Sequence, residues 1–433
     1  MSKIYITGHR NPDMDSICSA IGYANLKNLV NPENEYIAVR CSHIGETTKK
    51  LLAELNISAP PYMPNVYPKV GDVMLRPDLR IDADAALTEY AAIYNANNPS
   101  AIPVFEGDAY FNLISVDDIT AWAVSMLSNF NGNIKIPKIR DIVRQDSSRL
   151  EVEDKFTEGK AALSACKRRG LPVFDEDRFV GYVTRRCFLD MPRYNVILVD
   201  HNEQSQSIKG LETANIIEII DHHRLNALKT DLPLFIDAEP LGSTCTIVYQ
   251  LYLRNGIRPD RKTAKILLTG ILADTLILKS PTTTPIDIES AYALAAVSRE
   301  NVDDYGQHMF SKIEGLRSRD PVSVITSDFK TYNEQGTKIG IGQCEVTSLQ
   351  DLDIYSEEYL AALEEIRIKN GLDWTTLMIT DVIKEHSILL STSYTAEHNL
   401  QYVKVSDHIY DMPGVMSRKK QLLPELLHVL SQF

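Results

Sequence analysis

The chain has 433 residues, 44% of them hydrophobic and 24% charged, with a formal net charge of −13. This acidic balance argues against broad binding to nucleic acids or anionic membranes, although a local basic cluster or metal ions could still hold an anionic substrate. A chain of this length should form two to four domains, each with its own core.

Cysteine usage and hydropathy indicate the cellular compartment. The six cysteines are scattered without a CxxC pair, and the N-terminus enters a strand without a charged leader. No apolar run approaches the ~18 residues that span a bilayer. We therefore expect a soluble, cytoplasmic protein with reduced thiols, no membrane partner and no nucleic-acid partner.

Residues 1–65 alternate between strand and helix patterns. Strands are predicted at residues 3–6 and 35–39, and helices at 17–24 and 47–55. This order predicts the first part of a doubly wound, mostly parallel sheet. A proline cluster at 60–68 then predicts a domain boundary.

One imidazole and two carboxylates follow the first predicted strand, at His9, Asp13 and Asp15. In open α/β sheets, ligands bind at this carboxyl edge. One nitrogen and two hard oxygens suit Mn²⁺, Co²⁺, Mg²⁺ or Zn²⁺. The alternative is a surface turn in which Asp15 or Ser16 caps the following helix.

Residues 66–192 contain a weak internal repeat, with copies at about 66–125 and 136–192. Each copy has an opening turn, a helix, an apolar-Pro-Val-Phe strand, an acidic turn, a second strand and a polar cluster. The opening turns of the two copies are Val70–Met74 and Ile139–Val143. The alternative to a ligand-binding repeat is an inert α+β insertion that stiffens a dimer.

After residue 192 the doubly wound pattern resumes. A buried strand at 195–199 ends in Asp200, and another at 216–220 ends in Asp221-His222-His223. A long apolar helix then places Asp274 near its C-terminal part. Buried carboxylates are costly unless they are paired or bound to metal. Their repetition at strand ends therefore predicts one shared site.

The C-terminal part, residues 318–433, is predicted to form a second α/β unit. Its main predicted elements are a strand at 338–346, a helix at 355–369 and an apolar segment at 373–381. Near the end, Ser417-Arg418-Lys419-Lys420-Gln421 forms a basic cluster in an acidic chain. Alone, this cluster is also typical of a solvated helix start capped by Ser417.

Taken together, these motifs resemble those of a family II inorganic pyrophosphatase of the DHH phosphoesterase superfamily. The superfamily resemblance rests on His-x-x-x-Asp-x-Asp from His9, Asp-His-Asn from Asp200, Asp-His-His from Asp221, and Asp274. The Ser-Arg-Lys-Lys-Gln from Ser417 is the more specific pyrophosphatase feature. The internal repeat resembles a pair of CBS domains, modules that bind adenine nucleotides.

The resemblance implies an α/β architecture. A DHH domain, formed by residues 1–65 and 193–315, would be interrupted by a CBS pair at 66–192. Residues 318–433 would form the companion domain that binds phosphate. Members of the family are commonly homodimers, so a homodimer is expected.

The resemblance also implies residue roles for hydrolysis of pyrophosphate. Six ligands would hold two Mn²⁺ or Co²⁺ ions, with Mg²⁺ accompanying the substrate: His9 and Asp13 on one metal, Asp15, His222 and Asp274 on the other, and Asp200 bridging both. Four residues would contact the phosphates or the leaving group: His223, Lys338, Arg418 and Lys419.

In the CBS pair the resemblance implies contacts to AMP, ADP or ATP by Ser115, Asp118, Thr184, Arg185 and Arg186. AMP and ADP are expected to inhibit and ATP to activate. The second copy departs from the family pattern, because Cys187 stands where Asp is expected.

Three other functions compete with this one. An exopolyphosphatase shares the companion domain and the substrate chemistry. A DHH phosphodiesterase acting on oligonucleotides would require a glycine- and histidine-rich motif, and none follows residue 320. A catalytically silent adenine-nucleotide sensor would have lost metal ligands, but every ligand position is intact.

Overall fold

The computed structural model describes residues 2–128, 135–144, 148–226, 230, 232–311, 316, 319–334, 336–346, 348–349, 352–382 and 384–431. The chain forms two compact units: Met1–Val66 with Asn195–Phe433, and Tyr67–Tyr194. A continuous segment therefore interrupts the larger unit.

The first part of the larger unit is built on a five-stranded sheet in the order β11-β10-β9-β1-β2, with every neighbouring pair parallel. Its strands are β1 (Lys3–Thr7), β2 (Glu35–Val39), β9 (Asn195–Val199), β10 (Asn215–Asp221) and β11 (Phe235–Ala238). The predicted doubly wound, mostly parallel sheet is confirmed.

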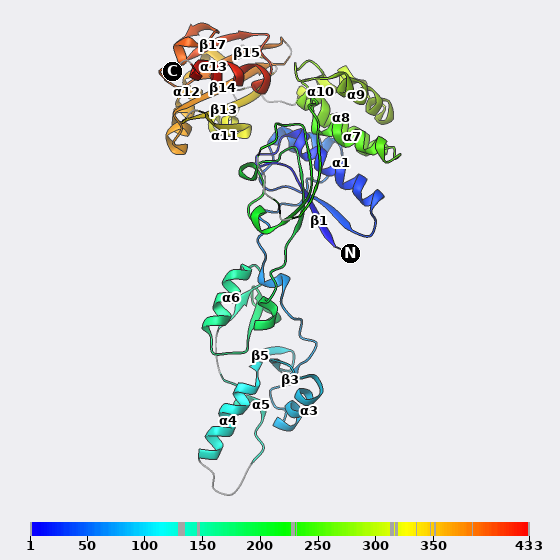
Figure 1. Cartoon of the computed structure of the whole chain (residues 1–433), viewed down its shortest axis with the longest axis vertical. Helices are drawn as coiled ribbons and strands as arrows, with labels where there is room; N and C mark the ends of the chain where they lie inside the picture. Colours follow the sequence, from blue (N-terminus) through cyan, green and yellow to red (C-terminus); the bar gives the residue numbers. More distant parts are fainter. Residues whose placement is uncertain are drawn as a thin grey trace. The chain divides into compact units, whose positions relative to one another are not determined.

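Helices accompany this sheet, some in contact with its strands and others packed on those helices (Figure 1), and together they enclose the main apolar core. They are α1 (Met14–Val30), α2 (Glu46–Glu54), α7 (Thr244–Arg254), α8 (Arg261–Asp274), α9 (Pro285–Ser298) and α10 (Val302–Phe310). The main core joins Ile6 of β1 and Ile197 of β9 to Leu267 of α8, all essentially inaccessible to solvent. This packing holds the carboxyl ends of the central strands in place.

The strand order reverses between β1 and β9. From β1 the chain passes to β2 on one side, and from β9 it continues through β10 to β11 on the other side. The loops after β1 and β9 therefore separate at a topological switch point, where open α/β sheets form their ligand crevice.

The C-terminal part of the larger unit has a six-stranded sheet in the order β12-β13-β14-β15-β17-β16. The strands are β12 (Phe329–Glu334), β13 (Thr337–Val346), β14 (Trp374–Asp381), β15 (His386–Ser391), β16 (Val403–Ser406) and β17 (Ile409–Pro413). Only the β13–β14 pair is parallel. The accompanying helical segments are α11 (Pro321–Ser327), α12 (Leu352–Asn370), a π-helical turn (Arg418–Leu422) and α13 (Leu423–Ser431).

The insert contains two similar halves, each with a three-stranded sheet. The first half comprises β3 (Ile81–Asp82), α3 (Leu87–Asn97), β4 (Ile102–Glu106), β5 (Ala109–Ile114) and α4 (Val116–Ser128). The second comprises β6 (Leu150–Glu151), α6 (Phe156–Ala165), β7 (Gly170–Asp175), β8 (Arg178–Thr184) and the short helix Arg185–Phe188. This agrees with the repeat seen in the sequence.

The opening turns, however, exchange places, so the prediction that each belongs to its own copy is wrong. Val70 packs in the core of the second half, with Leu150 and Phe156. Ile139, in α5 (Ile139–Ile142), packs in the core of the first half with Ile81. Each half completes its apolar core with a segment that lies outside its own stretch of sequence.

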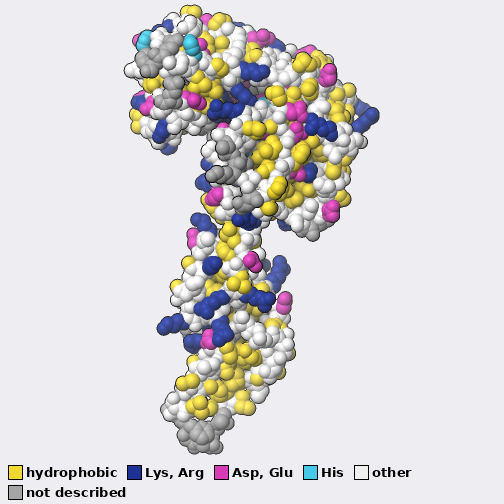
Figure 2. All heavy atoms as spheres, viewed as in Figure 1, with side chains coloured by type: hydrophobic (Ala, Val, Ile, Leu, Met, Phe, Trp, Pro, Cys, Tyr) yellow, Lys and Arg dark blue, Asp and Glu magenta, His cyan; other side chains and the backbone are white. Residues whose placement is uncertain are grey.

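Figure 2 shows Lys and Arg side chains interspersed with hydrophobic side chains on the visible face of the insert. Among the exposed apolar side chains of the insert are Leu75, Val124, Leu127, Ile136 and Leu189. Within the described part of the chain, no helix combines the length and apolar composition needed to cross a membrane.

Candidate metal centre

The predicted ligands gather where three parallel strands and one helix end. His9, Asp13 and Asp15 follow β1, Asp200 follows β9, and His222 follows β10. Asp274 is the last residue of α8. The ligand atoms form three overlapping groups in which all members lie within 4.8 Å of one another: His9 with Asp13 and Asp200, Asp200 with His222 and His223, and Asp15 with His222 and Asp274. The structure therefore brings together all six side chains from distant parts of the sequence.

The loop after β1 turns tightly into α1. Asp13 caps this helix, because its Oδ1 accepts the Ser16 N–H at 2.8 Å. The Ser16 hydroxyl oxygen accepts the His9 N–H at 3.1 Å. A side chain at Gly8 would place its Cβ 1.9 Å from that hydroxyl oxygen, so only glycine fits there. The helix cap is Asp13, not Asp15 or Ser16 as the capping alternative had it. Capping is compatible with a metal site, since Asp13 has a second oxygen.

The first group, His9 with Asp13 and Asp200, has the form of a metal site. The His9 Nδ1 lies 2.7 Å from the carbonyl oxygen of Arg10, which leaves Nε2 directed at the carboxylates. Nε2 lies 3.3 Å from Asp200 Oδ2 and 3.5 Å from Asp13 Oδ2. Neither His9 Nε2 nor Asp200 Oδ2 is reached by water or by a regular hydrogen bond. A divalent cation would satisfy both buried atoms.

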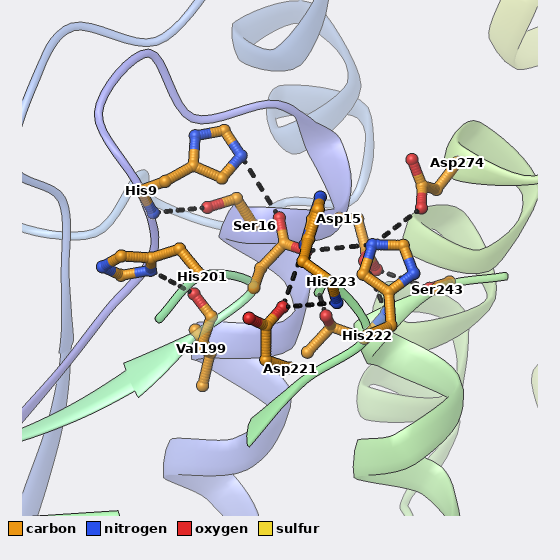
Figure 3. A network of polar contacts seen from close by, with 12 residues as sticks. His9, Asp15, Ser16, Val199, His201, Asp221, His222, His223, Ser243 and Asp274 are labelled. Carbon is orange, nitrogen blue, oxygen red and sulfur yellow. Dashed lines mark hydrogen bonds and ion pairs between the residues drawn. The ribbon is translucent and has the colours of Figure 1, made fainter. Parts of the chain in front are cut away.

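The second group is arranged in the same way. The His222 Nδ1 lies 3.0 Å from the carbonyl oxygen of Leu241. Its Nε2 lies 3.4 Å from Asp274 Oδ2 and 3.5 Å from Asp200 Oδ1, and Figure 3 shows His222 directed at Asp274. The two oxygens of Asp200 thus face different histidines, which suits a carboxylate that bridges two metals.

Burial and crowding perturb the titration of these groups. Burial and the neighbouring Asp200 and Asp13 raise the pKa of Asp15 to about 8. Burial, together with Asp15, raises the pKa of Asp274 well above its usual range. Burial lowers the pKa of His222, which favours the neutral form that binds metal. Cations placed among these carboxylates would offset their mutual repulsion, so the donor set fits divalent metals.

His223 is held in a fixed orientation beside this cluster. Its Nδ1 lies 2.9 Å from Asp221 Oδ1, and its backbone N–H donates to the same oxygen at 3.0 Å (Figure 3). The other oxygen of Asp221 accepts the Asn202 side-chain N–H at 2.6 Å. His223 Nε2 is therefore free to face the companion domain, where it lies 3.2 Å from Lys330 Nζ. Burial and Lys330 lower the pKa of His223 well below its usual value.

Lys330, rather than the predicted Lys338, is the strand lysine at the site. Lys338 is exposed at the start of β13, where its N–H donates to Asp373. In the β12–β13 ladder Lys330 lies opposite Ile341. Lys338 is three residues from Ile341, so its side chain points to the other face of the sheet, ~10 Å along the strand. Nothing in the local pattern distinguishes the two lysines without this register.

The side chains of the basic turn Ser417–Gln421 point in two directions: the lysines toward the metal ligands, and Arg418 into its own domain. Lys419 Nζ donates to the carbonyl oxygen of His222 at 3.1 Å, and burial lowers its pKa. Lys420 Nζ donates to the carbonyl oxygen of Pro281 at 3.1 Å. These lysines extend toward the domain that holds the metal ligands.

Arg418 instead points into its own domain and is only 7% exposed. Its Nη1 donates to the carbonyl oxygens of Asp328 at 2.8 Å and Ile341 at 3.3 Å, and its Nη2 donates to Asp328 Oδ1 at 2.8 Å. The family resemblance implies that this guanidinium contacts the substrate. In the structure, it anchors the turn that presents the two lysines.

In the insert, the polar clusters at the end of the last strand of each half, Ser115–Asp118 and Thr184–Cys187, have equivalent hydrogen bonds but different side chains. Asp118 Oδ2 accepts the N–H and hydroxyl of Ser115 at 2.8 and 2.9 Å. In the second half, Cys187 Sγ accepts the Thr184 N–H at 3.3 Å, so a thiol takes the place of the carboxylate. Asp118 also pairs with Arg144, which the sequence analysis did not identify.

The remaining predicted nucleotide contacts, Arg185 and Arg186, are exposed at the start of the short helix Arg185–Phe188. A further arginine, Arg168, is buried in the insert and donates to the side-chain oxygen of Asn112 at 3.0 Å. No sequence pattern identified Arg168, because its partner lies 56 residues away.

A parallel sheet with carboxylates and histidines at its switch point, followed by a mixed companion sheet, defines a DHH-type phosphoesterase. Residues 3–271 match the DHH family, N-terminal domain, and residues 307–429 match the DHHA2 domain. The chain therefore belongs to the DHH family.

Within this family the chain belongs with the metal-dependent inorganic pyrophosphatases. It is 37% identical over 235 residues to the manganese-dependent inorganic pyrophosphatase of Methanothrix thermoacetophila, covering 53% of this chain and 76% of the relative. It is 28% identical to the cobalt-dependent inorganic pyrophosphatase of Clostridium perfringens, over 99% of this chain and 98% of the relative. A Methanococcus jannaschii structure described as a family II inorganic pyrophosphatase shares the fold, with a TM-score of 0.63, 24% identity and 99% coverage of both chains. The predicted family and enzyme class are confirmed.

Proposed function

We propose that this chain hydrolyses inorganic pyrophosphate to two phosphates with two divalent cations, Mn²⁺ or Co²⁺, between the switch-point loops and the companion domain. The observation that supports this most directly is the pair of ligand groups that meet at Asp200. His9 and Asp13 would hold one cation, and Asp15, His222 and Asp274 the other.

When bound, two such cations acidify a shared water and polarise the oxygens of the attacked phosphate. The chain's own contribution begins with orientation. Contacts to the carbonyls of Arg10 and Leu241 hold His9 and His222 with Nε2 toward the carboxylates. Fixed ligands of this kind require no rearrangement when substrate binds.

The opposite side of the site is basic. Lys330 and Lys419 are the amines that face the ligand cluster, and each supplies a mobile positive charge for phosphate oxygens. His223 lies between this side and the metal ligands, with Nδ1 held by Asp221. Its Nε2 would contact the oxygen between the two phosphates. Pyrophosphate is an anion, so its charge would favour protonated His223 and allow Nε2 to give its proton to the departing phosphate.

Nucleotide control through the insert remains a prediction. It is supported by the two equivalent halves and by the Ser115–Asp118 contact, with Thr184, Arg185 and Arg186 as further proposed contacts. The role of Mg²⁺ with the substrate and a homodimeric assembly are also proposals.

Phosphate release from three substrates tests the proposed function: pyrophosphate, short-chain polyphosphate, and a dinucleotide, each with Mg²⁺ plus Mn²⁺ or Co²⁺. We expect turnover of pyrophosphate at least tenfold above that of the others. Preferred turnover of polyphosphate would identify an exopolyphosphatase, and preferred turnover of the dinucleotide a phosphodiesterase. Binding of adenine nucleotides without any hydrolysis would identify a silent sensor.

A further inference from the structure

The turn Leu241–Cys245, at the start of α7, encloses the carboxylate of Asp15. Asp15 Oδ1 accepts the Ser243 hydroxyl at 2.6 Å and the Cys245 N–H at 3.0 Å. Asp15 Oδ2 accepts the Thr244 N–H at 2.7 Å. Asp15 is only 1% exposed, so these three donors determine where its carboxylate lies.

The same turn contacts two more of the proposed metal ligands. The Thr244 hydroxyl donates to Asp200 Oδ1 at 3.0 Å. The carbonyl oxygen of Leu241 lies 3.0 Å from His222 Nδ1. Three of the six proposed ligands, from three different elements, therefore depend on one five-residue turn.

The segment Leu241–Cys245 is itself held by Asp287, a fully buried carboxylate in the first turn of α9. Asp287 Oδ2 accepts the Gly242 N–H at 2.8 Å, and Asp287 Oδ1 accepts the Thr246 hydroxyl at 2.6 Å. The approach is close, since a Cβ at Gly242 would lie 2.8 Å from Asp287 Oδ2 and 2.8 Å from Thr275 Cγ2. Only glycine lets the turn approach this carboxylate so closely.

Asp287 also caps its own helix, because its Oδ2 accepts the N–H and hydroxyl of Thr284, each at 2.7 Å. A capping carboxylate needs only such local donors. The contacts to Gly242 and Thr246 are different, because these residues precede Asp287 by 45 and 41 positions. They connect α9 to the turn that holds the ligands.

We propose that Asp287 is a positioning residue for the metal centre: it fixes the turn Leu241–Cys245 and, through that turn, the ligand atoms of Asp15, Asp200 and His222. Asp287 does not itself touch metal or substrate. The proposal rests on the proposed metal site. It assigns a role to a residue that lies in none of the motifs identified in the sequence.

Titration of chelator-treated, full-length protein with Mn²⁺ in a calorimeter tests this role. Three variants weaken the contacts of Asp287 with Gly242 and Thr246. Asp287→Ala removes both carboxylate oxygens, Asp287→Asn replaces one of them with an NH₂ group, and Thr246→Val removes the hydroxyl that donates to Oδ1. Thr246→Val removes only the contact at Oδ1 and keeps the helix cap, so it should fold even if Asp287→Ala does not. We expect Mn²⁺ affinity to fall at least tenfold in Asp287→Ala and at least threefold in Thr246→Val. We also expect the electron paramagnetic resonance signal of the coupled Mn²⁺ pair to change.

Asp260→Ala is the matched control. Asp260 caps α8 through the Thr263 N–H at 2.7 Å, at the end of that helix opposite Asp274. This variant should lose thermal stability while its Mn²⁺ affinity and resonance signal stay as in wild type. If the Asp287 and Thr246 variants behave like this control, Asp287 is a helix cap only and the proposal is overturned. If wild-type protein binds no pair of Mn²⁺ ions, the proposed metal site fails instead.

Discussion

Asp200→Ala should be more damaging than loss of any ligand that serves one metal. The two oxygens of Asp200 face different histidines, with Oδ2 3.3 Å from His9 Nε2 and Oδ1 3.5 Å from His222 Nε2. Asp274 contacts only the second group, through a distance of 3.4 Å to His222. Asp200→Ala therefore removes a proposed ligand from both metals, whereas Asp274→Ala removes one from a single metal.

The expected magnitude follows from that difference. Disturbing the support of one metal typically costs 10- to 100-fold in affinity or activity. Asp274→Ala should then lower kcat/KM by at least this factor. Asp200→Ala affects both groups, and multiplying the two effects gives a loss of about 10²- to 10⁴-fold, or ~2.7–5.4 kcal/mol of transition-state stabilisation.

The assay is phosphate release from pyrophosphate at saturating Mn²⁺, with calorimetric Mn²⁺ stoichiometry measured on the same preparations. Asp231 belongs to none of the motifs identified in the sequence and would be a natural control, but it lies outside the described residues. Asp303→Ala, at an exposed position in α10, serves instead and should retain wild-type activity. An Asp200→Ala defect no larger than that of Asp274→Ala would refute the bridging assignment.

Four further predictions follow from the same geometry. Lys330→Met should lower kcat/KM for pyrophosphate about 10- to 100-fold, ~1.4–2.7 kcal/mol, whereas Lys338→Met should change it by no more than about twofold. Equal effects of the two substitutions in steady-state kinetics would contradict the strand register. Arg418→Lys should lower both thermal stability and kcat/KM, because lysine lacks the two Nη groups that anchor the basic turn; unchanged kinetics would remove Arg418 from any supporting role. Replacing residues 67–194 with a short Gly/Ser bridge should leave an active enzyme whose activity does not respond to AMP, ADP or ATP. The prediction fails if this response survives the replacement, or if calorimetry detects no nucleotide binding to the intact chain. Burial lowers the pKa of His201 from 6.5 to about 4. The unfolded state therefore binds more protons between these pH values, and the free energy of unfolding should fall by roughly 3 kcal/mol as the pH drops from 6.5 toward 4. Chemical denaturation across this range should show a pH dependence about one proton smaller in His201→Gln, and an identical dependence would show that another group is responsible.

The metal ligands were the part of this site most accessible from sequence. His9, Asp13 and Asp200 lie one to six residues beyond buried apolar strands, and parallel strands bring their carboxyl ends to one edge of a sheet. Polar residues that end several such strands must therefore meet. The same reasoning identified His222 and the doubly wound sheet.

The basic side of the site was less accessible, because it depends on strand register. Lys330 and Lys338 lie eight residues apart in neighbouring strands, and only the β12–β13 pairing decides which one faces the cluster. Arg418 was identified as part of a motif, but its burial against Asp328 follows from how the turn packs on β12 and β13. A charged side chain in a motif does not reveal which of its neighbours it will contact.

What the sequence by itself determined is local chemistry: which strands end in metal-binding side chains, where the insert interrupts them, and which residues form the basic turn. Tertiary structure alone decided the contacts between distant segments. Val70 and Ile139 exchange places between the halves of the insert because each fills the other half's apolar core. Asp287 reaches Gly242 because α9 packs against α7, although 45 residues separate them in the chain. Such contacts depend on how helices and sheets pack, and side-chain packing has no periodicity along the sequence from which it could be read.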